Sequence, residues 1–147
     1  MPIIIHTPHM DKLRGTQRIV EIIEAEGVEK SRIIIDHNTE ATLELSLSTG
    51  CWCGMTVYPI SKLTPERVSN MIHQYGPERI IVNGSADWGV SDPLSLVKVV
   101  EFMATHKHSD ETIQKLVFDH AMAFYSPSPN WKPELDITPM EVREFQR

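Results

Sequence analysis

The chain has 147 residues, of which 41% are hydrophobic and 23% charged, and its formal net charge is −6. This length and composition are those of a soluble globular domain with its own core. The negative charge argues against nucleic acid or an anionic membrane surface as the main partner, and the apolar runs are too short to span a membrane. No signal peptide is visible, and Cys51 and Cys53 are too close for an ordinary disulfide framework, so we expect a cytoplasmic protein.

Four short strands are predicted, and each is followed by a helix. The expected strands are residues 2–5, 32–36, 51–58 and 79–83, which are rich in β-branched or aromatic residues. Three of them contain continuous apolar runs, at residues 3–5, 33–35 and 80–82, which are typical of strands buried on both faces. The expected helices cover residues 11–26, 40–49 and 65–75, and a fourth begins at Asp92-Pro93. Gly15 is expected to weaken the first half of the helix at 11–26.

This alternation of strand and helix predicts a parallel sheet with right-handed crossovers. A barrel of eight such units typically needs roughly 250 residues. Two architectures are therefore open: a doubly wound sheet, or half of a barrel. We expect this domain to occupy residues 1–125, with a further helix capped by Ser109. Residues 126–147 are predicted to be an irregular Pro-rich tail with a short helix at 139–145, which docks through Trp131 or frays.

Polar residues follow three of the predicted strands at their carboxyl ends, namely His6, His37 and Asp87. In either architecture, ligands bind beyond these ends. Two imidazoles and a carboxylate are a reasonable ligand set for a divalent metal such as zinc. The metal would lower the pKa of a bound water, and a nearby carboxylate could take the proton. Alternatively, the histidines simply cap buried strands with a hydrogen bond, and Asp87 is a turn residue.

For other residues near these strand ends, the sequence allows two interpretations, one functional and one structural. His9 could line a substrate pocket or be a solvated loop histidine. Trp88 could line the pocket, or it could simply pack against the protein after a buried strand. Lys62 and Arg67 could attract an anionic substrate or mark a solvated helix start. The two cysteines are expected to pack in the core rather than bind a soft metal.

Four motifs together resemble a known family. In chain order they are His6-Thr7-Pro8-His9, Asp36-His37-Asn38-Thr39-Glu40, Tyr58-Pro59 and Ser85-Ala86-Asp87-Trp88-Gly89-Val90-Ser91-Asp92-Pro93. Over about residues 2–124, the chain resembles the C-terminal half of the TatD-related metal-dependent hydrolases of the amidohydrolase superfamily. The resemblance implies an α/β fold that is half of a (β/α)8 TIM barrel. It would have four parallel strands, each followed by a helix, plus a C-terminal helix and the Pro-rich tail.

The resemblance also implies roles for particular residues. His6 and His37 would be metal ligands, and Asp87 would bind metal and accept the proton of the attacking water. His9, Asn38, Tyr58 and Trp88 are candidate pocket residues. The implied cofactor is a divalent metal, with zinc preferred over manganese or magnesium.

The family's first-strand His-x-His and its acidic ligand on the fourth strand have no counterpart in this sequence. The expected function is hydrolysis of a phosphoester or amide-type bond in a small-molecule substrate by metal-activated water. A partner would supply four more strands, either as the missing N-terminal half or as a second copy in a homodimer, since unpaired edges need cover. The alternative is a truncated or divergent half barrel without catalytic activity that acts as an interaction module.

Overall fold

The structure is a computed structural model that describes residues 1–58, 60–86 and 89–132. Its centre is a sheet of four parallel strands in the order β1-β2-β3-β4. The strands are β1 (Ile3–His6), β2 (Ile33–Asp36), β3 (Trp52–Val57) and β4 (Ile80–Gly84). A doubly wound sheet reverses its strand order at a switch point, whereas barrel strands follow one another around the barrel. The unbroken order therefore makes this sheet half of a (β/α)8 barrel, and it confirms the predicted fold class.

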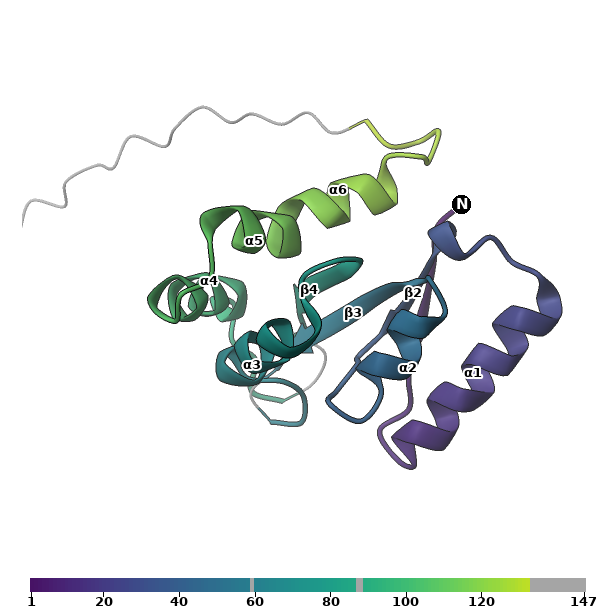
Figure 1. Ribbon diagram of the computed structural model, residues 1–147, viewed down its shortest axis with the longest axis horizontal. Helices are drawn as coiled ribbons and strands as arrows, with labels where there is room; N and C mark the ends of the chain where they lie inside the picture. The colour runs from purple at the N-terminus through teal and green to yellow at the C-terminus, as the bar shows by residue number, and fades with distance from the viewer. Residues whose placement is uncertain (59, 87–88, 133–147) are drawn as a thin grey trace, which may run out of the picture.

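Helices connect the strands and continue after the last one (Figure 1). They are α1 (Lys12–Glu26), the short 3-10 turn η1 (Lys30–Arg32), α2 (Leu43–Ser48), α3 (Pro65–Tyr75), α4 (Ser95–Thr105), α5 (Asp110–Gln114), η2 (Lys115–Asp119) and α6 (His120–Tyr125). Within the part of the chain that the structure describes, no helix is long and apolar enough to cross a membrane.

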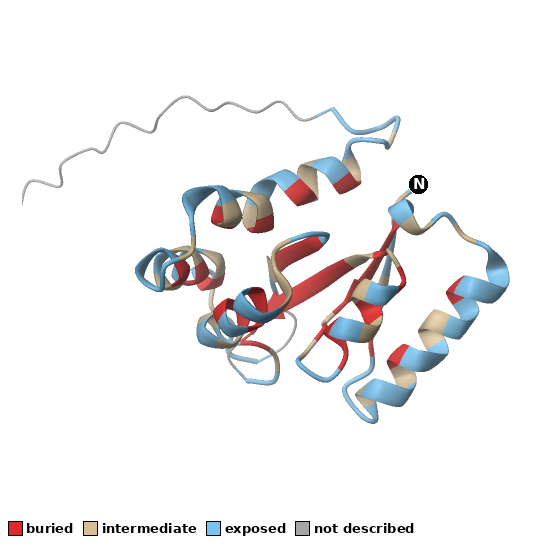
Figure 2. Cartoon of the chain, viewed as in Figure 1, coloured by how far each residue is buried: buried red, intermediate tan, exposed pale blue. Residues whose placement is uncertain are grey.

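The helix-covered face of the sheet holds the main core (Figure 2). Its buried residues on β3 and β4 are Cys53, Met55, Val57, Ile80 and Val82. They pack against apolar residues of α3, α4 and the α5–η2 segment, including Met71, Val99 and Leu116. Burial raises the pKa of the Cys53 thiol to about 12, so this thiol stays protonated. Both cysteines are free and buried, as predicted.

Alternate strand residues point to the opposite, inner face. Near the starts of the strands, Ile34 and Ile81 on this face are covered by Phe124 of α6. Near the ends of the strands, the inner-facing residues are polar, namely His6, Asp36, Thr56 and Asn83. The inner face is thus apolar at one end and polar at the end where ligands bind in such sheets.

Strand β1 differs from the prediction of three buried strands. It pairs only with β2, and Ile3 and Ile4 are 39% and 45% exposed. Helix α1 covers part of its outer face, where Ile5 of β1 and Ile19 and Val20 of α1 pack against the same buried cluster. An apolar run predicts burial only where a neighbour exists on each side, and β1 lies at the edge of the described sheet.

Two helices begin later than predicted. Helix α2 starts at Leu43 because residues 39–42 form a turn in which the Thr42 hydroxyl accepts from the Thr39 amide. Helix α4 starts at Ser95, after a turn at Asp92.

In the predicted Pro-rich tail, Trp131 stacks on Tyr125 with ring centroids 5.6 Å apart. The predicted helix at 139–145 lies outside the described residues.

The structure gives Gly15 a role that helix propensity alone does not reveal. A Cβ atom at this position would lie 2.3 Å from Cγ of Pro8 and 2.8 Å from its Cδ. Replacing an interior helix glycine by alanine ordinarily stabilises by about 0.5–1 kcal/mol. We expect Gly15→Ala to destabilise the protein instead, by about 1–3 kcal/mol, because the rigid proline ring must move. Urea denaturation measures the change.

The control for Gly15→Ala is Asn70→Ala, at an exposed position within α3. This control is expected to be neutral or slightly stabilising. If Gly15→Ala stabilises the protein as much as the control does, then the contact between Pro8 and α1 does not constrain the helix.

Candidate metal site

The two predicted histidine ligands meet at the carboxyl end of the sheet. His6 ends β1, and His37 directly follows β2. Nδ1 of His6 and Nε2 of His37 are 2.9 Å apart, and the two rings meet edge to face with centroids separated by 4.6 Å. Two histidines that are 31 positions apart in the sequence therefore converge through the pairing of β1 with β2.

A local backbone feature aims His37 at His6. In a regular strand, Asp36 would point inward and residue 37 outward. The backbone of His37 instead has a φ of 63°, in the left-handed region. This conformation ends the strand and returns the imidazole to the inner side. It costs about 1–3 kcal/mol for a residue other than glycine, and such costs are typical of functional sites.

The structure adds Asp36 to the site. The ligand atoms of His6, Asp36 and His37 all lie within 4.8 Å of one another. Asp36 ends the predicted strand at 32–36 and belongs to one of the family-like motifs, but it was not among the ligands predicted from the sequence. One signal could have identified it: strand alternation places the residue before His37 on the inner face, opposite His6.

The Asp36 carboxylate is held by donors from its own strand and from the next two. Its Oδ1 accepts from the His37 amide at 2.8 Å, the Thr56 hydroxyl at 3.2 Å and Nδ2 of Asn83 at 3.1 Å. Gly54 on β3 leaves the space that the carboxylate occupies, since a Cβ there would lie 2.0 Å from Oδ1. The carboxylate is buried, and these three hydrogen bonds to Oδ1 offset part of its desolvation.

Thr56 links Asp36 to His37. Its hydroxyl lies 2.6 Å from Nδ1 of His37. A hydroxyl has one proton, and here it is donated to Asp36, so the oxygen accepts from Nδ1–H of His37. The lone pair of His37 is then on Nε2, the nitrogen that faces His6. This is the tautomer that a metal on Nε2 requires, and the arrangement is the usual one for a metal-binding histidine.

Burial lowers the pKa of His37 to about 4. The charge of Asp36 opposes this shift, whereas the charges of Lys62, His6 and Lys12 add to it. His37 is therefore neutral near pH 7, as a metal ligand must be.

The donor set fits a divalent metal. Two imidazole nitrogens that share a zinc ion at 2.0–2.1 Å in tetrahedral geometry are separated by about 3.3 Å. The observed 2.9 Å between the His6 and His37 nitrogens is close to that value. A buried carboxylate within reach of both supplies an oxygen of the kind that zinc accepts.

Two lysines flank His37. Lys12 donates to the Thr7 hydroxyl and to the carbonyl of His37, both at 2.9 Å. Nζ of Lys62 lies 3.4 Å from Nε2 of His37 and donates to the Ser85 hydroxyl at 3.2 Å. Burial, and then the charge of Lys62, lower the pKa of Lys12, while Asp36 opposes them. Lys12 was not among the residues identified from the sequence.

Arg67, which together with Lys62 was predicted as a cation that could attract an anionic substrate, binds Glu40 instead. Its guanidinium forms a bidentate pair with Glu40, at 2.8 and 2.6 Å. This pair raises the pKa of Arg67 and lowers that of Glu40. Among the described residues, Lys12 and Lys62 are therefore the cations beside His37.

The remaining predicted pocket residues have different surroundings. Asn38 is buried, donates to the carbonyls of Ile35 and Gly54, and accepts from the hydroxyls of Thr42 and Ser46. These hydrogen bonds of the Asn38 amide stabilise the loop after β2. Asn38 also borders a small void beside His37. His9 is exposed and borders the same void. Tyr58 is buried, with the Lys62 ammonium 5.8 Å from its ring centroid. Asp87 and Trp88 lie outside the described residues.

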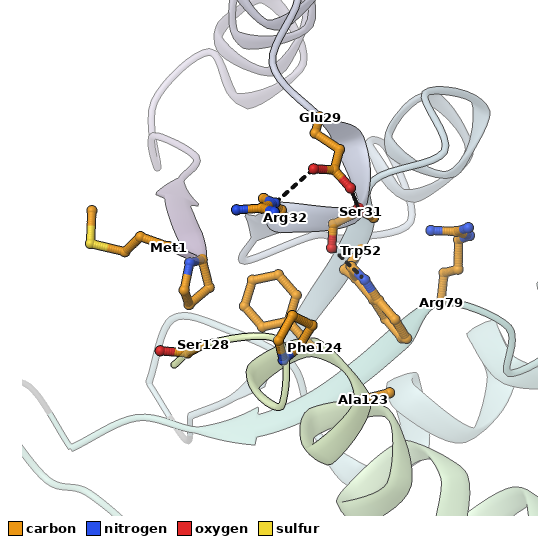
Figure 3. A pocket seen from close by; sticks show the side chains of 11 residues that line it. Met1, Glu29, Ser31, Arg32, Trp52, Arg79, Ala123, Phe124 and Ser128 are labelled. Carbon is orange, nitrogen blue, oxygen red and sulfur yellow. Dashed lines mark hydrogen bonds and ion pairs between the residues drawn. The ribbon is translucent and has the colours of Figure 1, made fainter. Parts of the chain in front are cut away.

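A separate pocket of about 210 Å³ lies near the starts of the strands (Figure 3). Trp52, Phe124 and Arg32 are among its lining residues, and the Arg32 guanidinium is paired with Glu29 at 2.7 Å. In barrels of this kind, chemistry takes place at the opposite, carboxyl end of the strands. The histidine site at that end is therefore the functional candidate.

Comparison with known proteins finds a sequence relative and solved structures of similar fold. An uncharacterized metal-dependent hydrolase of Methanocaldococcus jannaschii is 32% identical over 127 residues, which are 85% of this chain and 49% of that protein. A TatD-like protein of Archaeoglobus fulgidus matches with a TM-score of 0.65 and 27% identity, over 86% of this chain and 47% of that chain. No family model matches.

The second solved structure shows the fold alone. A phosphotriesterase of Mycobacterium tuberculosis matches with a TM-score of 0.66 and 20% identity, over 84% of this chain and 45% of that one. In each comparison, this chain spans about half the length of the protein that it matches.

Thr56→Val tests whether the hydroxyl positions His37. The two side chains have nearly the same shape, but valine cannot connect Asp36 to His37. We expect the affinity for zinc to fall about 10- to 100-fold, the range for losing the group that orients a ligand. A zinc titration against a competing chelator measures this affinity.

The control is Thr105→Val, which removes an exposed helix hydroxyl that bonds to the carbonyls of Glu101 and Phe102. It is expected to leave zinc affinity unchanged. Equal zinc affinity in wild type and Thr56→Val would mean that Thr56 does not orient the ligand.

Proposed function

We propose that this chain, a relative of the TatD-related metal-dependent hydrolases that spans about half of their length, holds a divalent metal ion through His6 and His37 as part of a hydrolytic site. One observation carries the proposal: the 2.9 Å approach of Nδ1 of His6 to Nε2 of His37 at the carboxyl ends of adjacent barrel strands. The relative from M. jannaschii is itself described as metal-dependent, which supports a metal here.

Zinc is the metal that we propose first, with manganese and magnesium as alternatives. Imidazole nitrogens suit zinc, whereas magnesium and manganese favour sites made of oxygen atoms. When bound, the metal would lower the pKa of a water molecule so that it can act as a nucleophile near neutral pH. The reaction that we propose is hydrolysis of a phosphoester or amide-type bond in a small-molecule substrate.

We propose a separate role for each residue of the metal site. His6 and His37 hold the metal in their neutral forms. Asp36 keeps the Thr56 hydroxyl in place, and through it the His37 ring, and its carboxylate is near enough to both histidines to be a third ligand. By the resemblance to the family, Asp87 is proposed as a ligand and as the acceptor of the proton of the attacking water.

We propose that a second four-stranded unit completes the barrel, either as the missing half or as a second copy of this chain. The exposure of Ile3 and Ile4 on β1 supports this proposal, because an edge strand with apolar side chains needs cover. The same open edge would suit the alternative function, that of a non-catalytic interaction module. Free, buried cysteines are consistent with the cytoplasm as the proposed compartment.

The direct test is metal binding by wild type and His37→Ala. Wild type is expected to bind zinc, and the variant to bind it at least about 100-fold more weakly, because a two-histidine site cannot survive the loss of one ligand. Isothermal titration calorimetry and metal analysis of the purified protein measure this difference. The control is His73→Ala, at an exposed position on α3. A wild type that binds no more zinc than His37→Ala defeats the proposal.

Solution mass tests self-association. A homodimer would have twice the 16.8 kDa of one chain. We expect Ile4→Lys to shift the protein toward monomer, because it places a charge on the inner side of the β1 edge. Ile22→Lys, at an exposed position on α1, is the matched control and is expected to leave the mass unchanged. A clean wild-type monomer by light scattering contradicts the second copy and leaves a separate half as the partner to seek.

A further inference from the structure

We propose that the stacked imidazoles of His73 and His108 are a pH-sensitive switch between α3 and the loop that connects α4 to α5, residues 106–109. The switch is closed near neutral pH and opens in acid. The two ring centroids are 3.9 Å apart, and the ring planes are inclined by 27°. His73 lies in the last turn of α3. Neither histidine belongs to the proposed metal site, so this inference is independent of the proposed hydrolytic function.

The loop is attached both to its own helix and to α3. The ring of His106 stacks on Phe102 of α4 with centroids 3.8 Å apart, and its Nδ1 donates to the Phe102 carbonyl at 2.7 Å. The amide of His108 donates to the carbonyl of Met103 at 3.2 Å. Nε2 of His108 lies 2.8 Å from the hydroxyl of Ser69, a buried residue of α3. His106 therefore ties the loop to α4, whereas the His108 side chain connects it to α3.

The backbone of the loop is strained. Lys107 has a φ of 67°, in the left-handed region that is unfavourable for a residue with a side chain. Such a conformation persists only when the surrounding contacts hold it. Here those contacts are made by His106 and His108 on either side. Loss of the His108 contact would let the backbone relax, which favours the open loop.

Protonation of both rings weakens the stack, because two imidazolium ions in contact repel each other. Burial, and then the charges of His73 and His106, lower the pKa of His108 from its ordinary value of 6.5, while a hydrogen bond with Ser69 opposes them. The unfolded chain therefore binds this proton more tightly than the folded protein does. The contact contributes its full stability above about pH 6.5 and loses it as the pH falls.

The other charged groups on the elements around the stack are paired elsewhere or exposed to solvent. Those in ion pairs with other residues are Arg67 of α3, Lys98 of α4 and Glu111 of α5. Those at exposed positions are Glu66 of α3, Glu101 of α4, Lys107 of the loop and Asp110 of α5. Among the described residues, the charges that act on His108 are those of His73 and His106. Protonation of the histidines themselves therefore decides whether the stack holds.

The helices on both sides of the loop are anchored independently of the stack. Met103, before the loop, and Ile113, after it, are both buried in the main core. The Ser69 hydroxyl can bond to a carbonyl of its own helix when His108 leaves, as serines within helices do. Opening would therefore be confined to the loop and the end of α3, in a protein that stays folded.

The test is a double-mutant cycle of His73→Ala and His108→Ala, measured by urea denaturation at about pH 7.5 and about pH 5, on either side of the ordinary histidine pKa. At the higher pH, we expect the pair to favour folding about 2- to 10-fold beyond the separate effects of the two residues, the range for an aromatic pair. At the lower pH, we expect this coupling to vanish or change sign. The lowered pKa of His37 also weakens folding in acid, but His37 is present in all four proteins, so its contribution cancels.

Titration of the histidines by nuclear magnetic resonance is the second measurement. We expect His73→Gln to raise the pKa of His108, because it removes a positive charge beside that ring. The control is Gln74→Ala, at the next exposed position of α3, which is expected to leave the titration of His108 unchanged. If His73→Gln also leaves it unchanged, or if the coupling is equal at the two pH values, then the stack is not a pH-sensitive switch.

Discussion

The arrangement at the carboxyl end of the sheet depends on where the Asp36 carboxylate lies. It occupies space that exists only because residue 54 is a glycine, and it accepts hydrogen bonds from the His37 amide, Thr56 and Asn83. These contacts connect β2, β3 and β4 around one buried charge. They also hold the turn in which His37 takes its left-handed backbone conformation. By accepting the Thr56 proton, the carboxylate helps to fix both the direction and the tautomer of the His37 ring.

The electrostatics of the site follow from the same contacts. His37 is neutral because it is buried, and its free nitrogen faces His6 because Thr56 takes the proton of the other nitrogen. Lys12 and Lys62 then add positive charge beside the neutral His37.

Much of the fold could be predicted from the sequence because strand and helix signals are local. The β-branched and aromatic strand segments and the predicted helices between them indicated the alternating units, and position at the strand ends indicated His6 and His37. Residues whose role depends on neighbouring strands were missed. Asp36 matters because of Gly54, Thr56 and Asn83, which strand register brings to it. Lys12 matters because its side chain reaches back to the His37 carbonyl, and no local pattern encodes that contact.

We propose that His6 and His37 share one metal ion. The most direct measurement is anomalous X-ray diffraction at the zinc edge from crystals of the zinc-loaded protein. The structure predicts one strong peak about 2.0–2.1 Å from both Nδ1 of His6 and Nε2 of His37, the usual zinc–imidazole distance. A peak bound to other side chains, or no peak between these two nitrogens at saturating zinc, would contradict the claim.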